Sequence, residues 1–457
     1  MTQPGDRDRP SPVGGAPVRA ARTEGRVRWS TLFGLTSYLR SALWTIPFVS
    51  IAIVFAITPI LRALDDAIRW EMLGLHVEGA KALLGTVITL TLSFMVFTFG
   101  SLLVAIQVAG GQLTPRIIAT MLLRDNVVRY SVGLFVFSLM FSVIALDRFG
   151  DRVHQLVVLI VALLGIACLA MFLFLIDYAA RLLRPVTIVG RIGDDGLAMI
   201  ESVYPRRAED AAGDSAAVAA PRGAPDRIAL HAGQAGIVLA LDVATLVAEA
   251  ERADGIVEFV PQIGDFVAAG EPLFALHGGA ASVSDDRLRS AVAFGPERTL
   301  EQAPMFAFRI LVDIALKALS PAINDPTTAV LAIDQVHRLL KAVGHRTLRG
   351  ETIAGASGRP RVVLRTPNWE DYVHIAFTEI RACGASSVQV ARRLRAMLED
   401  VAASLPPRRR VALDDERRRL DLTIEAHFAI ADDLALARVP DRQGIGGSLA
   451  GRPDDER

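Results

Sequence analysis

Leu83–Ala109 reads LLGTVITLTLSFMVFTFGSLLVAIQVA and contains no charged residue. Three further charge-free apolar runs lie nearby, at Ala42–Leu61, Tyr130–Leu146 and Gln155–Ile176. About 20 apolar residues of helix cross the hydrocarbon core of a bilayer, where each backbone polar group must be bonded within its own segment. We therefore predict a four-helix transmembrane domain at residues 28–185, with spans at about 42–61, 83–109, 127–146 and 155–176.

The composition suits a protein that is partly in the membrane and partly in water. Of the 457 residues, 52% are hydrophobic, the formal net charge is +0 and the mean hydropathy is +0.38. A neutral chain gives no electrostatic reason to expect nucleic acid as a partner. Cys168 and Cys383 are far apart, and no metal-binding, cofactor-binding or catalytic spacing occurs. We therefore predict no enzymatic activity and no cofactor.

The distribution of Lys and Arg predicts the orientation in the membrane. The segment before the first span, the second connection and the segment after the fourth span are rich in Arg and poor in acids. In the first connection, acidic residues offset the basic ones. Because positive loops stay inside the cell, both termini and everything after about residue 180 are expected in the cytosol.

The remainder of the chain divides by composition. Residues 1–27 and 437–457 are predicted to be disordered, and residues 186–225 to form a connector and a flexible linker. Turn-punctuated strands at 226–280 predict a small β-rich cytosolic module, and helical periodicity predicts a helical cytosolic domain at 281–436. The expected fold is a multi-pass α-helical membrane protein with a mixed α/β, mainly helical, cytosolic C-terminal region.

The second span carries a stripe of small and polar residues along one helix face, at Thr86, Thr89, Ser93, Gly100 and Gln107. One interpretation is close packing against a neighbouring helix, because small residues let helix backbones approach. The other is the lining of a water-filled path for a small ion or solute. The run is about 40 Å long as a helix, so it is expected to tilt or to continue into the cytosol.

Charged residues mark the predicted membrane interface. Asp177 ends the fourth span and lies one helical turn before Arg181, which favours an ion pair at the interface over a gate or an ion site. Arg116, in the segment Gln112–Arg116 after the second span, is expected to contact lipid phosphate or to fix orientation.

A turn bracketed by two prolines is the sharpest local feature of the predicted cytosolic region. Its candidate residues are Ser320, Pro321, Asn324, Asp325 and Pro326. Asp325 as a helix cap, with Pro326 at the first helical position, explains most of the pattern structurally. The alternative is functional, with oxygens of Asn324 and Asp325 offered to a cation or hydrogen-bonded to the membrane helices.

Four segments resemble a known family. They are Gln112–Arg116, Gly264–Pro272, Glu297–Gln302 and, most specifically, Leu319–Ala329. The chain resembles the DUF2254 family of bacterial predicted membrane proteins from about residue 40 to 435. The resemblance implies a location in the bacterial cell (inner) membrane and four spans followed by a cytosolic region, with no established activity. Where family members often have a His-His pair, this chain has Asp177-Tyr178.

Two functions remain open from these observations. The polar stripe and the long second span favour a homo-oligomeric channel or transport-type protein with a cytosolic regulatory domain. The charge-free spans and the large polar region favour a non-transporting scaffold or sensor whose cytosolic domain binds a ligand or a partner protein. The predicted partners are the lipid bilayer, further copies of the chain and a small ion or solute.

Overall fold

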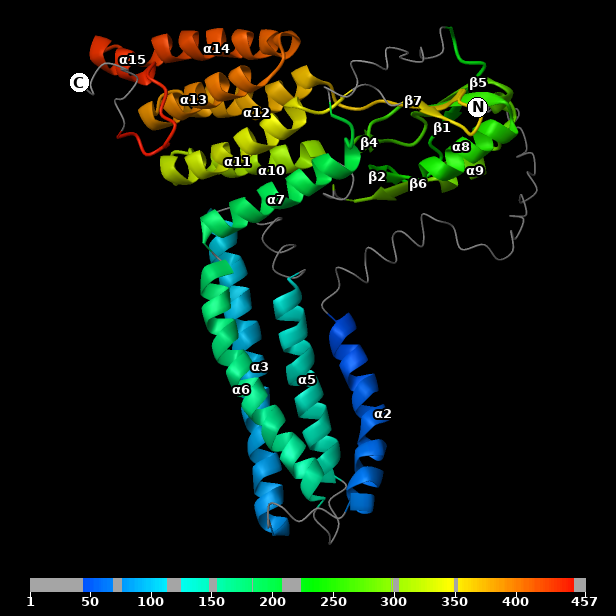
Figure 1. Cartoon of the computed structure of the whole chain (residues 1–457), viewed down its shortest axis with the longest axis vertical. Helices are drawn as coiled ribbons and strands as arrows, with labels where there is room; N and C mark the ends of the chain where they lie inside the picture. Colours follow the sequence, from blue (N-terminus) through cyan, green and yellow to red (C-terminus); the bar gives the residue numbers. More distant parts are fainter. Residues whose placement is uncertain are drawn as a thin grey trace, which may run out of the picture.

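The computed structural model of the chain describes residues 44–68, 76–112, 125–147, 154–182, 184–207, 223–296, 298, 304–348 and 352–447. An elongated bundle of apolar helices stands beneath a larger head, which contains a helical unit and a β-rich unit side by side (Figure 1). Arg116, residues 1–27, residues 208–222 of the predicted linker and residues 448–457 lie outside the described residues.

The apolar bundle contains all four helices that the sequence predicts. They are α2 (Thr45–Ile68), α3 (Val77–Gln112), α5 (Asn126–Asp147) and α6 (Gln155–Leu182). Each is long and apolar enough to cross a membrane. Helix α5 contacts the other three helices and is the most buried of the four. Its Phe135 and Phe141 are fully buried, and small residues such as Gly133 and Ser138 let the neighbouring helices approach.

Helix α3 runs past the length that a bilayer needs. Its 36 residues span roughly 54 Å at about 1.5 Å per residue, against about 30 Å of hydrocarbon. Leu102 and Ile106, near its end, pack against the hydrophobic core of the helical unit. The surplus length therefore joins the bundle to the head.

The helical unit is built around one hydrophobic core. It comprises α7 (Pro185–Val203), α10 (Pro304–Ala318), α11 (Pro326–Gly344), α12 (Trp369–Gly384), α13 (Val388–Ser404), α14 (Pro407–His427) and α15 (Ala431–Ala437). The sequence predicted a connector where α7 lies. Ile188, Ile192 and Ile200 recur at helical spacing and are buried against α10 and α11, so this segment is part of the core.

Two glycines of α7 are expected to respond oppositely to alanine. A Cβ on Gly196 would lie 2.9 Å from carbon atoms of both Ala307 and Leu339, whereas one on Gly190 meets no described atom within 4 Å. Gly196→Ala should destabilise the protein by about 1–2 kcal/mol through overpacking. Gly190→Ala should stabilise it by about 0.5–1 kcal/mol through helix propensity. Denaturant unfolding in detergent measures both, and equal effects would contradict the packing of α7.

The β-rich unit is assembled from two separate parts of the chain. Its elements are β1 (Arg227–Leu230), β2 (Gly236–Leu241), α8 (Val243–Arg252), β3 (Gly255–Phe259), β4 (Phe266–Val267), β5 (Pro272–Gly278), η2 (Gly279–Ser282), α9 (Asp285–Ser290), β6 (Val292–Gly295), β7 (Thr352–Ala354) and β8 (Pro360–Leu364). The strand orders are β1-β5-β3-β8-β7 and β4-β2-β6. The unit therefore extends beyond the predicted limit at residue 280 and takes in a hairpin from between α11 and α12.

The parallel pairing of β3 with β8 joins these two parts. Val257 lies opposite Val362 and Phe259 opposite Leu364, and all four side chains are buried in the core of this unit. The chain leaves the helical unit after α11, adds two strands to the sheet and returns to form α12 (Figure 1). The two units of the head are therefore interlocked.

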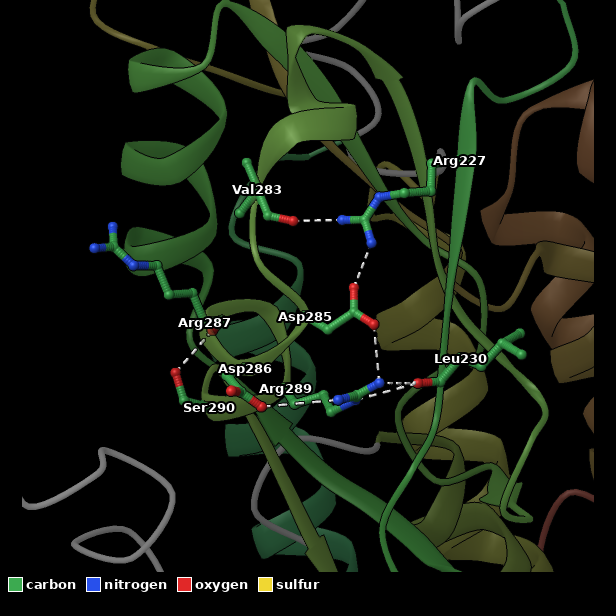
Figure 2. A network of polar contacts seen from close by, with 8 residues as sticks. All are labelled: Arg227, Leu230, Val283, Asp285, Asp286, Arg287, Arg289 and Ser290. Carbon is green, nitrogen blue, oxygen red and sulfur yellow. Dashed lines mark hydrogen bonds and ion pairs between the residues drawn. The ribbon is translucent and has the colours of Figure 1, made fainter. Parts of the chain in front are cut away.

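A polar network fastens the edge strand β1 to α9 (Figure 2). Arg227 Nη1 donates to Asp285 Oδ1 at 2.5 Å, and Arg289 Nη2 donates to Asp285 Oδ2 at 3.0 Å. Arg289 also donates to the carbonyl of Leu230, at 3.0 Å from Nη2. Arg289 thus supplies a hydrogen-bond donor to a carbonyl of the edge strand. We therefore interpret the network as one that stabilises the fold.

His337 on α11 predicts a pH dependence of stability. Arg393 Nη2 donates to its Nδ1 at 3.0 Å, so Nε2 carries the proton and donates to Asp400 Oδ2 at 2.9 Å. Burial and the charge of Arg393 hold the pKa of His337 below its ordinary value of 6.5. The unfolded chain then binds the extra proton first, and stability falls as the pH drops below 6.5.

We expect His337→Gln to flatten this loss between pH 6.5 and about pH 5 in thermal unfolding. Lys341 lowers the pKa of Asp400 from its ordinary value of 3.8. Protonation of Asp400 therefore changes stability only near and below pH 3.8, outside the range in which His337 acts. An identical slope in the variant and the wild-type protein would contradict the assignment.

Candidate functional site

The candidate site is the junction where the apolar bundle meets the head, and Asp125 is its centre. The Asp125 side chain is 1% exposed and directly precedes α5. Its Oδ1 accepts from the backbone N–H groups of Val127 and Val128, at 2.9 and 3.3 Å. This is an N-cap arrangement, which satisfies donors that a helix start leaves free.

The second oxygen of Asp125 reaches two other helices. Oδ2 accepts from the Tyr178 hydroxyl of α6 at 2.7 Å and from Arg191 Nη2 of α7 at 2.9 Å. Arg191 is 39% exposed, so the ion pair lies at the edge of the buried region. One carboxylate therefore connects two helices of the apolar bundle to the first helix of the head.

The chain turns sharply between α6 and α7. Arg184 is extended, with φ −67° and ψ 131°, and Pro185 begins α7. A residue before proline is driven out of the helical region, so the two helices cannot merge into one. Helix α7 consequently crosses the end of the bundle beneath the other head helices (Figure 1).

A second connection joins the end of α3 to α10. Lys317 Nζ donates to the carbonyl oxygen of Gly110 at 2.9 Å. Gly110 lies in the last turn of α3, where carbonyl groups lack helical partners and carry the negative end of the helix dipole. A cation at this position therefore holds α3 to the head.

The predicted turn after α10 follows this contact directly. Asp325 Oδ1 accepts from Thr328 N at 3.0 Å and Oδ2 accepts from Thr328 Oγ1 at 2.5 Å, with Pro326 at the first helical position of α11. Ser320 Oγ donates to the carbonyl of Lys317 at 2.7 Å. Asn324 has a φ of +47°, a conformation that Asn adopts more readily than most residues. Pro321 is exposed. The geometry matches the capping interpretation of this motif.

The predicted stripe of α3 faces away from the other helices of the bundle. Thr86, Thr89, Ser93, Gly100 and Gln107 are all exposed. The three hydroxyls donate within α3, to the carbonyls of Ala82, Gly85 and Thr89 at 2.8, 2.9 and 2.8 Å. The face that packs inside the bundle carries Leu84, Thr91, Thr98 and Ala105 instead. Among the described residues, the stripe therefore does not pack against another helix.

Asp177 and Arg181 form the ion pair that their spacing predicts. Their side chains are 57% and 65% exposed. Solvent-exposed pairs of this kind contribute at most about 1 kcal/mol to stability. Their position in the membrane interface remains a prediction.

The opposite end of the bundle is closed by a carboxylate that the sequence analysis did not single out. Asp65 of α2 is 6% exposed, and its Oδ1 accepts from Leu156 N of α6 at 3.1 Å. Its Oδ2 lies 3.1 Å from His154 Nδ1. Within the described ranges, no group of three or more His, Cys, Asp or Glu is placed to hold a metal ion.

Comparison with known proteins agrees with the apolar bundle. Uncharacterised proteins of Mycobacterium bovis and Mycobacterium tuberculosis are 24% identical over 422 residues, which covers 88% of this chain and 80% of theirs. No solved structure matches. The profile of a family described as predicted membrane protein matches residues 40–400. This chain therefore belongs to the DUF2254 family of predicted membrane proteins.

Proposed function

We propose that the protein is a homo-oligomeric channel or transport-type protein of the cell membrane, whose head lies in the cytosol and regulates the membrane helices. The observation that carries this proposal is the outward direction of the polar stripe on α3. A Gln side chain and a series of hydroxyls on the outer surface of a bundle suit a shared, hydrated axis better than lipid. Several copies of α3 around that axis would place these groups towards a small ion or solute.

The contacts of α3 with the head support a regulatory role for the head. Leu102 and Ile106 pack on the core of the helical unit, and Lys317 binds the last turn of α3. Because helices move as rigid elements, a displacement of α10 reaches the stripe along the length of α3. The turn at Ser320–Pro326 follows α10 and fixes its distance from α11.

Charge at the two ends of the bundle supports a cytosolic head. Among the described residues, the head end of the bundle carries Arg129, Arg181, Arg184 and Arg191, against Arg62 and Lys81 at the other end. Cys383 is exposed on the head and Cys168 is buried in the bundle. A membrane-impermeant maleimide should therefore modify the wild-type protein only after the cells are permeabilised. Glu78→Cys in a Cys383→Ser background should react in intact cells, and modification of Cys383 in intact cells would reverse the orientation.

Flux through reconstituted vesicles tests the channel proposal. Purified protein should conduct potassium or chloride across phospholipid vesicles, and Ser93→Phe on the stripe should reduce that flux at least tenfold. Ala170→Phe is the matched control, because Ala170 is exposed on α6 away from the stripe. The absence of flux under every ionic condition, or equal flux in both variants, would contradict the proposal.

The junction favours a second function, a sensor or scaffold without transport. The bond from Arg191 to Asp125 ties the head to the bundle, so binding of a partner protein to the head can be transmitted to the membrane helices without a pore. Hydrogen exchange at α5 and α6 on addition of a partner, in protein that shows no flux, distinguishes this function from the first.

A further inference from the structure

A cavity of about 210 Å³ lies between α3 and α6, next to the junction. Phe97, Thr98 and Ser101 of α3 line one side, Phe172 and Tyr178 of α6 the other, and Val128 of α5 closes the back. Phe172 stacks on Phe94 with 4.5 Å between ring centroids, which holds the two helices together at this height. The lining is almost entirely apolar, and apolar cavities of about 150 Å³ stay dry and accept apolar ligands.

The cavity opens on the outer surface of the bundle. Phe97 and Ile176 at its rim are 56% and 47% exposed, whereas Thr98 and Leu175 inside are each 5% exposed. Away from the α3 stripe, the outer surface of an apolar bundle in a membrane protein faces lipid, and the rim residue Ile176 lies on α6. A lipid chain can therefore enter from the side without crossing water.

The height of the cavity corresponds to the end of the apolar run. On α6 its lining extends from Phe172 to Leu182, and Asp177 is the first charged residue after the fourth span. The cavity thus lies at the level where acyl chains meet their glycerol esters. Arg181 and Arg184, both exposed, follow at the head end of α6.

Thr98 supplies the polar group that such a ligand needs. Thr98 lines the cavity, and its Oγ1 is buried and has no hydrogen-bond partner among the described residues. A buried hydroxyl without a partner costs about 1–3 kcal/mol. Rotation of the Thr98 side chain would turn this hydroxyl to the cavity, where it would donate to an ester carbonyl oxygen and that cost would be removed.

We propose that the cavity binds one acyl chain of an anionic phospholipid, with an ester carbonyl at Thr98 and the phosphate towards Arg181 and Arg184. Tyr178 lines the cavity and donates to Asp125, so the bound lipid touches the group that holds the head to the bundle. This makes the junction responsive to the lipid. The site requires neither a pore nor a second copy, so it stands or falls independently of the channel proposal.

Native mass spectrometry of the full-length protein, with added phosphatidylglycerol, tests the site. The wild-type protein should retain one phosphatidylglycerol per chain after release from detergent. Ser101→Phe places a ring over the cavity and should lower that occupancy at least tenfold, whereas Ala170→Phe, on the other face of α6, should leave it unchanged.

Thr98→Val provides a second variant that keeps the side-chain volume and removes only the hydroxyl. Loss of one hydrogen bond should weaken phosphatidylglycerol binding about fivefold. The proposal is overturned if the wild-type protein retains no phosphatidylglycerol, if Ser101→Phe retains as much as the wild-type protein, or if detergent fills the cavity with equal affinity.

Discussion

Asp125→Ala is expected to destabilise the protein by about 2–3 kcal/mol and to loosen α7 from the bundle. The helix cap accounts for about 1 kcal/mol. The bonds from Tyr178 and Arg191 to a carboxylate that is 1% exposed contribute the rest, discounted because Arg191 is 39% exposed. Thermal unfolding in detergent measures the total, and hydrogen exchange of the α7 amides measures the loosening.

Two variants separate the cap from the connection. Asp125→Asn keeps an oxygen for the backbone of α5 but removes the charge, so it should lose mainly the ion pair with Arg191. A double-mutant cycle of Asp125→Ala with Arg191→Ala should give a coupling energy of about 1 kcal/mol or more. Strict additivity would show that the two residues do not interact, and the junction would then be held by apolar contacts alone.

The apolar bundle could be predicted from the sequence because a bilayer imposes a one-dimensional rule. A helix must be long and uncharged to cross it, and Leu83–Ala109 meets that rule without reference to any partner. The pairing of β3 with β8 follows no such rule. It joins Val257 to Val362, and helices α10 and α11 lie between these residues in the chain. An alternating strand pattern predicts which face of a strand is buried, but it does not predict which strand will be the partner.

Within the candidate site, contacts between residues close in the chain could also be predicted, whereas contacts between distant residues could not. The turn at Asp325 could be predicted because its partner Thr328 is three positions along the chain. Asp125 lies in a connection that is rich in Arg and poor in acids, and its role could not be predicted because Tyr178 and Arg191 belong to helices that only the fold brings to it. The residues of the stripe lie on the exposed face of α3, and the direction of that face depends on which other face packs.

The segment after α15 is more ordered than the sequence predicted. The sequence predicted disorder from residue 437, because Gly, Arg and Asp dominate and no periodicity remains. The structure places Asp441 fully buried, with its Oδ2 accepting from Gly446 N at 2.7 Å. Asp441 N also donates to the carbonyl of Arg392 on α13 at 3.1 Å, so contacts with α13 and bonds within the segment together order it.

Removal of residues 439–457 is therefore expected to destabilise the helical unit by about 2–4 kcal/mol. Arg392 of α13 is fully buried, and its Nε and Nη1 donate to the carbonyls of Val439 and Gly446 at 3.0 and 2.9 Å. Without the segment, the guanidinium loses these two acceptors while much of it stays buried. Breaking a buried charged contact from one side costs more than replacing the whole contact with apolar groups. Thermal unfolding of the full chain and of the truncated chain measures the loss.

A longer truncated chain and an Arg392→Leu variant serve as controls. A chain that ends at Gly447 retains the bonds from Arg392 to Val439 and Gly446, so it should lose less stability than the chain that ends at Arg438. Arg392→Leu in the chain that ends at Arg438 should recover part of the lost stability, because a leucine side chain needs no hydrogen-bond acceptor. If ending the chain at Arg438 or at Gly447 has the same effect, the segment contributes nothing to stability. If Arg392→Leu recovers nothing, the loss comes from apolar contacts such as Gly444 against Val330 rather than from the buried charge.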